Sequence, residues 1–214
     1  MSDTFPQTPR TAIRRRPERG RYDRDLVHRV LDEALVCHVG FVQDGEPRII
    51  PTAITRIGEH VYLHGSHGNR MLSALAGGAL ACIEVTLIDA LVAGRSGFGC
   101  SMDYRSVVIY GVGEIVADAD KEAVMEAVVQ DLIPGHQVRR LKQKELDATL
   151  VLRFALEEVS AKVRDLGVID MDGDYELDLW AGTIPLRLQA GAPVDDPKLK
   201  PGIAVSEVLK KYCR

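Results

Sequence analysis

The sequence has little of what marks disulfide-rich, membrane or nucleic-acid-binding proteins. Its four cysteines are scattered over 214 residues without a Cys-x-x-Cys pair, which favours buried reduced thiols over disulfides or a metal site. No apolar run reaches the roughly 18 residues of a membrane span. The net charge of −4 argues against general binding to nucleic acid, which needs a basic face. The first ten residues lack the apolar core of a secretory signal, so a cytoplasmic location is expected.

Side chains that carry out catalysis unaided are also scarce. No Ser–His–Asp order stands out. His60, His64 and His67 lie close together in the sequence, and His60 and His64 would share one strand face as a possible metal pair. A third and fourth ligand beside that pair are not evident, so no metal site is expected. Few residues suit general acid–base work. This indicates either a binding protein or an enzyme whose cofactor supplies the chemistry.

The composition that is present, 46% hydrophobic and 27% charged, is that of a globular protein with an ample core. The length predicts one large domain with extensions. We expect an N-terminal arm at 1–20, a main domain at 21–190 and a C-terminal extension at 191–214. The basic arm lacks interleaved aromatics, which favours packing against its own or a partner subunit over binding nucleic acid.

Hydrophobic periodicity predicts a mainly β fold with flanking helices. Strands are expected at 35–42, 47–57, 60–64, 79–87, 104–116 and 149–156. Helices are expected at 23–34, after residue 70, at 118–132 with Asp118 or Asp120 as cap, and at 138–146. Pro51 predicts an edge strand or a bulge, and the glycine-rich second part of 88–103 predicts a loop. Short antiparallel strands in succession favour a meander or barrel.

The stretch 60–75 begins as a strand and ends as an apolar helical stripe. Between them lies the segment GSHGNR, residues 65–70, whose glycines allow the backbone to approach a ligand closely. Ser66, Asn69 and Arg70 place polar and charged groups at the start of the helix, which are the parts of a phosphate site. The alternative is a strand-to-helix turn, with Ser66 or Asn69 as N-cap and Arg70 in solvent.

Several motifs in one order resemble a known family. They are YLHGSHGNRML, EVTLIDALVAGRS, SMDYRSVVIYGVGEIV and LWAGTIPL. The chain resembles the pyridoxamine 5'-phosphate oxidase-related flavin-binding proteins, and most closely their nitroimidazole-resistance-like branch. The resemblance covers about residues 10–190.

The resemblance implies an FMN-binding split β-barrel that works as a homodimer, with one FMN in each of two clefts at the subunit interface. It implies a backbone edge along the isoalloxazine ring, a bend that holds the ribityl phosphate, and a segment that reaches the flavin partly from the other subunit. The implied cofactor-binding residues are Pro51, Thr52, Ala53, Ile54, His64, Gly65, Ser66, Asn69, Arg70, Arg95, Ser96, Ser101, Tyr104, Arg105 and Trp180.

Three departures from the family pattern bear on this site. Asparagine is expected where Asp103 stands, and a carboxylate near the phosphate is unfavourable unless it pairs with Arg105. Asn69 stands where true oxidases carry a second basic residue, so less charge holds the phosphate. The substrate-phosphate motif of true pyridoxamine phosphate oxidases is not recognisable at the C-terminus. The resemblance therefore does not imply vitamin B6 synthesis.

The leading functional hypothesis is an FMN-dependent oxidoreductase that passes electrons through flavin N5 to a small organic acceptor. His64 is the candidate for contacting that acceptor, and a hydrogen-bonded wall residue is its alternative role. Two other hypotheses stay open. One is a flavin carrier or sensor without turnover, and the other is a split barrel that holds haem or the deazaflavin F420 in place of FMN.

Overall fold

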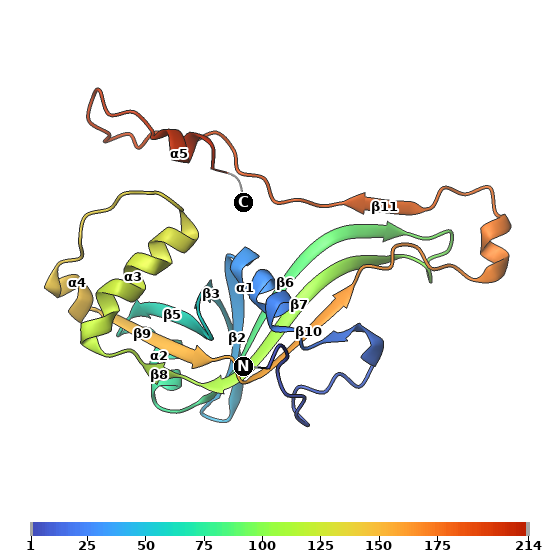
Figure 1. Cartoon of the computed structure of the whole chain (residues 1–214), viewed down its shortest axis with the longest axis horizontal. Coiled ribbons are helices and arrows are strands. Elements are labelled where there is room, and N and C mark those ends of the chain that lie inside the picture. Colours follow the sequence, from blue (N-terminus) through green and yellow to red (C-terminus); the bar gives the residue numbers. More distant parts are fainter. Residues whose placement is uncertain (1, 213–214) are drawn as a thin grey trace.

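The computed structural model describes residues 2–212, in which antiparallel strands form two sheets (Figure 1). The larger sheet has the order β1 (Gly20–Arg21), β10 (Glu158–Arg164), β7 (Ser101–Val112), β6 (Leu80–Ala93), β2 (Val36–Gln43) and β3 (Glu46–Ala53), and β11 (Gly182–Pro185) pairs with β6. The smaller sheet has the order β4 (Thr55–Ile57), β5 (His60–Ser66), β9 (Thr149–Ala155) and β8 (Glu114–Ile115). The mainly β prediction is confirmed.

Helices flank these sheets where the sequence carries an apolar stripe. They are α1 (Arg24–Glu33), α2 (Arg70–Ala76), α3 (Asp118–Leu132), α4 (Gln143–Asp147) and α5 (Glu207–Lys210), with 3-10 turns η1 (Pro17–Arg19) and η2 (Asp172–Glu176). In α1 the spacing of Val27, Val30 and Leu31 places all three in the core. None of the helices described within 2–212 is long and apolar enough to cross a membrane.

Strand β5 lies between two hydrophobic clusters and contributes side chains to both, because its side chains alternate between the two faces of the sheet. Val61 and Leu63 are fully buried in the main core between the sheets. On the other face, Tyr62 packs against a smaller cluster that includes Val124 and Val128 of α3. This alternation places His64, two residues after Tyr62, on the face that α3 covers.

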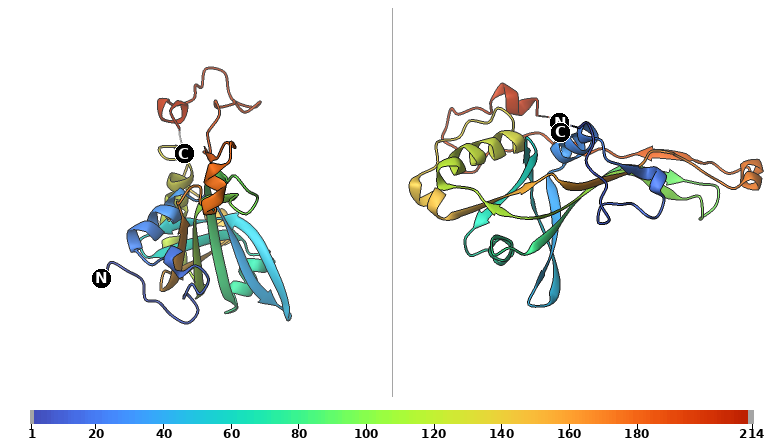
Figure 2. Two further views of the ribbon diagram at one scale, coloured as in Figure 1. Left: turned by 90° about the vertical axis from the view of Figure 1, so that its right-hand side faces the viewer. Right: turned by 60° about the horizontal axis from the view of Figure 1, so that its bottom comes forward.

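The longest strands form a projecting hairpin, residues 88–103, that extends beyond the body of the molecule with β11 along its edge (Figures 1 and 2). Strand β6 continues to Ala93 and β7 begins at Ser101, so the loop expected in this region is limited to 94–100. The strands extend further than expected because β6 pairs with β7 on one edge and with β11 on the other.

Smaller differences from expectation have local causes. The strand expected at 47–57 breaks at Ile54 and not at Pro51, which lies within β3. Because β3 ends the sheet order, the missing N–H of Pro51 is tolerated there, as expected for an edge strand. Ala117, not an aspartate, is the N-cap of α3 and makes no side-chain cap bond. The helix expected at 138–146 is reduced to α4, which begins only at Gln143.

The N-terminal arm packs on its own subunit. Phe5 is buried in the core, and the guanidinium carbon of Arg24 lies 4.2 Å from the centre of its ring. Thr8 Oγ1 donates a 3.0 Å hydrogen bond to Glu158, which also pairs with Arg10. The arm is therefore a structural part of the domain.

Candidate functional site

The bend between β5 and α2 is built from its own side chains. Asn69 Oδ1 accepts a 3.2 Å hydrogen bond from Leu72 N, which makes Asn69 the N-cap of α2. Ser66 Oγ accepts a 3.1 Å hydrogen bond from Gly68 N. A Cβ on Gly65 would lie 3.0 Å from Leu72 Cδ1, so glycine allows the helix to pack closely on the strand. The N-cap reading of Asn69 is confirmed, and its contact with a cofactor stays a prediction.

Arg70 has a different environment from its neighbours in the bend. Its side chain is exposed and makes no hydrogen bond or ion pair with the residues described in 2–212. It lines a cavity of about 130 Å³ with residues of the β2–β3 hairpin, including Phe41, Ile50 and Arg48. Arg48 also pairs with Glu46. The sequence analysis missed Arg48, because only the fold places it beside Arg70.

Residues 51–54 lie at the end of β3. Pro51 is exposed, Thr52 and Ala53 are half-buried, and Ile54 is 3% exposed between β3 and β4. Within 2–212 no other strand pairs with the outer edge of β3. Backbone groups along this edge can therefore meet a ligand, as the resemblance implies.

His64 lies opposite Val151 in the β5–β9 pairing and is half-buried. Burial lowers the pKa of its imidazole, because the charged form is poorly solvated there. At pH 7 the side chain is neutral, so one ring nitrogen is free to accept a hydrogen bond or to ligate a metal. No cluster of three or more metal-ligating side chains occurs in the part of the chain that the structure describes.

His64 makes stability depend on pH. Because its folded-state pKa lies below the unfolded value of about 6.5, acidification protonates the unfolded chain first. The free energy of unfolding therefore falls as pH drops from about 6.5 towards the lower folded pKa. We expect His64→Gln to weaken this acid-side loss in melting curves from pH 7.5 to 5. Exposed His67→Gln is the control, and an unchanged pH slope in His64→Gln would contradict the assignment.

The tip of the projecting hairpin is held by a carboxylate that the sequence analysis missed. The Asp170 side chain is fully buried between Gly94 and Gly99. It accepts hydrogen bonds from Arg95 N, at 3.0 Å, and from Arg95 Nη1, at 3.1 Å. The Arg95 guanidinium carbon also lies 5.2 Å from the ring centre of Tyr175. Arg95 is thus fixed at the tip by residues that lie about 75 positions further along the chain.

This contact predicts which glycine of the tip is required. A Cβ on Gly99 would lie 2.0 Å from Asp170 Oδ1, whereas a Cβ on Gly97 would meet nothing within 4 Å. Gly99→Ala is expected to cost about 1–3 kcal/mol by overpacking, and Gly97→Ala much less. Limited trypsin cleavage after Arg95 should be faster in Gly99→Ala. Equal cleavage of the two variants would contradict this account.

Asp103 and Arg105 do not pair with each other, so the pairing that was considered between them is wrong. Asp103 is 8% exposed and pairs with Arg164, which is 4% exposed. Arg105 binds two other carboxylates, at 2.6 Å from Glu33 Oε2 and 2.6 Å from Asp89 Oδ1. The guanidinium of Arg105 is therefore already occupied, and its role with a cofactor stays a prediction.

The remaining expected residues lie in or next to the projecting hairpin. Ser96 Oγ accepts a 3.4 Å hydrogen bond from Gly99 N, Ser101 is exposed and Tyr104 is half-buried. Trp180 is 70% exposed and precedes β11.

The expected residues thus form two groups in one chain. One group surrounds the end of β3 and the β5–α2 bend, and the other follows the projecting hairpin. The hairpin tip and α2 lie at opposite sides of the molecule in Figure 1.

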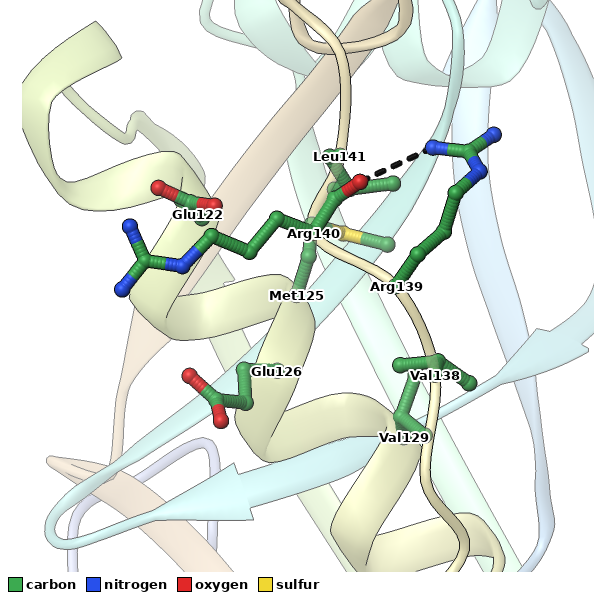
Figure 3. Close-up of a pocket in the computed structure, with 8 residues that line it drawn as sticks. All are labelled: Glu122, Met125, Glu126, Val129, Val138, Arg139, Arg140 and Leu141. Atoms are coloured by element: carbon green, nitrogen blue, oxygen red, sulfur yellow. Dashed lines mark hydrogen bonds between the residues drawn. The ribbon is translucent and has the colours of Figure 1, made fainter.

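A larger cavity, of about 360 Å³, lies between α3 and the segment 138–141 (Figure 3). Met125 and Val129 of α3 contribute apolar surface to it. Arg139 at its edge is held by a 2.8 Å hydrogen bond to Glu145 Oε2. None of the expected cofactor residues lines this cavity.

Two antiparallel sheets around one core, with a projecting hairpin, define a split-barrel protein. Residues 23–163 match the model of the pyridoxamine 5'-phosphate oxidase family, and the chain belongs to that family. The comparison with curated proteins finds no match.

Solved structures extend the likeness over nearly the whole chain. The flavocytochrome Anf3 from Azotobacter vinelandii is 35% identical, with a TM-score of 0.90 over 96% of this chain and 97% of its own. The FAD and haem binding protein from Mycobacterium smegmatis is 34% identical, with a TM-score of 0.86 over 89% of this chain and 95% of its own. A candidate 5-nitroimidazole resistance protein from Bacteroides thetaiotaomicron is 19% identical, with a TM-score of 0.57 over 67% of this chain and 86% of its own, and shares the fold.

Proposed function

We propose that this protein is a flavin-dependent oxidoreductase, which works as a homodimer with a flavin at each of two clefts between the subunits. The observation that carries the proposal is the likeness, at 34% and 35% identity over most of the chain, to an FAD and haem binding protein and a flavocytochrome. The bound flavin would supply the redox chemistry, and the protein would bind and orient the ring and the small organic acceptor.

The cavity at Arg70 fits the anionic end of such a cofactor. Two guanidinium groups, of Arg70 and Arg48, line it, and guanidinium groups bind phosphate oxygens with charge-assisted hydrogen bonds. Its volume of about 130 Å³ is below the roughly 300 Å³ of the smallest ordinary ligand sites. One chain would therefore hold the phosphate, and the ring would need surface from a second subunit.

The surface area of the chain supports the homodimer. A compact monomer of 23.5 kDa has about 9,800 Å² of accessible surface. This chain has 13725 Å², an excess of roughly 4,000 Å². Obligate dimers bury about 1,000–2,500 Å² on each partner. If a second copy lay against the projecting hairpin, the exposed Trp180 of the first chain would lie towards the end of β3 and the β5–α2 bend of the second.

The flavin is proposed to be FMN, as the family resemblance implies, with FAD as the alternative that the relative from Mycobacterium smegmatis favours. FMN and FAD share the ring and the first phosphate, so the contacts proposed for Arg70 apply to both. The two cofactors are distinguished by chromatography of the flavin released on heating.

Haem is a second candidate ligand, in addition to the flavin. His64 offers a half-buried neutral imidazole, which is the form that ligates haem iron. The relative from Mycobacterium smegmatis is named as a haem-binding protein, and the relative from Azotobacter vinelandii is named as a flavocytochrome. His64 is accordingly proposed either to contact the acceptor or to ligate the iron.

The absorbance spectrum of the purified protein tests these proposals. Flavin bands are expected, and an additional Soret band that is lost in His64→Ala would identify haem bound through this residue. Bleaching of the flavin bands by NADH or NADPH, followed by reoxidation with an acceptor, would distinguish an enzyme from a carrier. A protein that binds neither FMN nor FAD when titrated would contradict the proposed function.

A further inference from the structure

The C-terminal strap, residues 187–205, crosses back over the molecule from β11 to α5 (Figures 1 and 2). It is attached at both ends. At one end Leu186 N donates a 2.8 Å hydrogen bond to Asp89 O, and at the other Tyr212 Oη donates a 2.9 Å hydrogen bond to Leu132 O. Between these attachments, every residue from Arg187 to Ala204 is exposed.

The strap exposes the kind of side chain that normally makes contacts. Leu188 is 71% exposed, Val194 is 93% exposed and Ile203 is 55% exposed. Holding an extended segment in one conformation costs about 1–2 kcal/mol per residue in backbone entropy, which contacts must offset. Contacts with its own subunit are few, because every strap residue except Val205 is exposed.

Two hollows lie close to the ends of the strap. Near β11 a groove of about 600 Å³ separates the strap from β6, and both of its walls are partly apolar. The strap side contributes Leu186 and Leu188, and the β6 side contributes Leu87 and Ile88. A second hollow, of about 420 Å³, lies at the far end beside Val208.

We infer that the strap clasps a second copy of the same chain. The excess surface of roughly 4,000 Å² per chain is sufficient for a dimer interface. In a symmetric dimer each strap would hold the partner, and each chain would offer the same exposed apolar surface in return.

This inference rests on the homodimer of the proposed function, and its test separates the two. Leu188→Glu with Val194→Glu places two charges in the proposed clasp. Gln189→Glu with Ala192→Glu adds the same charge to the same segment without removing a large aliphatic side chain. Analytical ultracentrifugation is expected to show a dimer dissociation constant raised at least about 100-fold in the first variant and by less than about threefold in the control.

Hydrogen exchange of residues 187–205 gives a second measurement on the unmodified protein. Exchange is expected to be slow where the dimer is populated and to approach the free-chain rate on dilution to monomer. Slow exchange at every concentration would place the strap on its own subunit and overturn the inference. Fast exchange in the dimer, or equal dissociation constants for the two variants, would also overturn it and leave the homodimer standing. A wild-type chain that stays monomeric while still binding flavin would overturn the clasp and the proposed dimer together.

Discussion

Asp103→Ala is expected to lower the free energy of unfolding by about 3–5 kcal/mol, because it leaves a buried guanidinium without its counter-ion. Asp103 and Arg164 are 8% and 4% exposed. The carboxylate also accepts a 3.2 Å hydrogen bond from Gly167 N, and Arg164 Nη2 donates a 2.8 Å hydrogen bond to Gly167 O. The pair therefore fixes the chain where it leaves β10. Urea unfolding measures the loss.

Two other variants calibrate this result. Asp103→Asn keeps the shape and a hydrogen-bond acceptor but removes the charge, so a smaller loss is expected. Arg153→Ala breaks the surface pair with Glu114, whose side chains are 46% and 66% exposed, and should cost less than about 1 kcal/mol. If Asp103→Ala unfolds at the same urea concentration as Arg153→Ala, the buried pair does not have the role assigned to it.

Arg70→Ala is expected to weaken flavin binding by about 1.5–3 kcal/mol, the contribution of a hydrogen bond to a charged group. Its effect on stability should be small, because the side chain is exposed and makes no hydrogen bond or ion pair with the described residues. Titration of the flavin-free protein, followed by quenching of flavin fluorescence, measures the affinity.

Arg48→Ala is expected to weaken binding less than Arg70→Ala, because Arg48 also pairs with Glu46. Arg153→Ala is the control, since Arg153 does not line the cavity. Unchanged flavin affinity in Arg70→Ala would remove the phosphate assignment and leave the fold and family untouched.

Local signals in the sequence were sufficient for much of the fold. The strands expected at 35–42 and 47–57 correspond to β2 and to β3 with β4, and the Asp-Gly pair between them, at 44–45, is typical of the hairpin turn that joins β2 and β3. The helix expected at 118–132 is α3, with the observed limits. The length of the projecting hairpin could not be predicted in this way. It depends on β11, which pairs with β6 from about 90 residues away. The insertion of Asp170 between two glycines is likewise a contact between distant segments.

The candidate site shows a similar limit. The motif at 65–70 located the bend and offered Asn69 as its N-cap, which the structure confirms. The motif could not reveal that the β2–β3 hairpin places Arg48 beside Arg70. A strand was expected from residue 104, but the pattern could not reveal that Asp103 pairs with Arg164 and that Arg105 pairs with Glu33 and Asp89, because these partners come from distant segments. The resemblance supplied the list of cofactor residues, and one chain does not bring that list together.

The most direct test of the account is size-exclusion chromatography with light scattering and flavin absorbance recorded on the same peak. The account predicts a mass near twice 23.5 kDa with about one flavin per chain. A monomer that carries flavin, or a dimer that binds neither FMN nor FAD, would contradict the claim that the cofactor lies between two subunits.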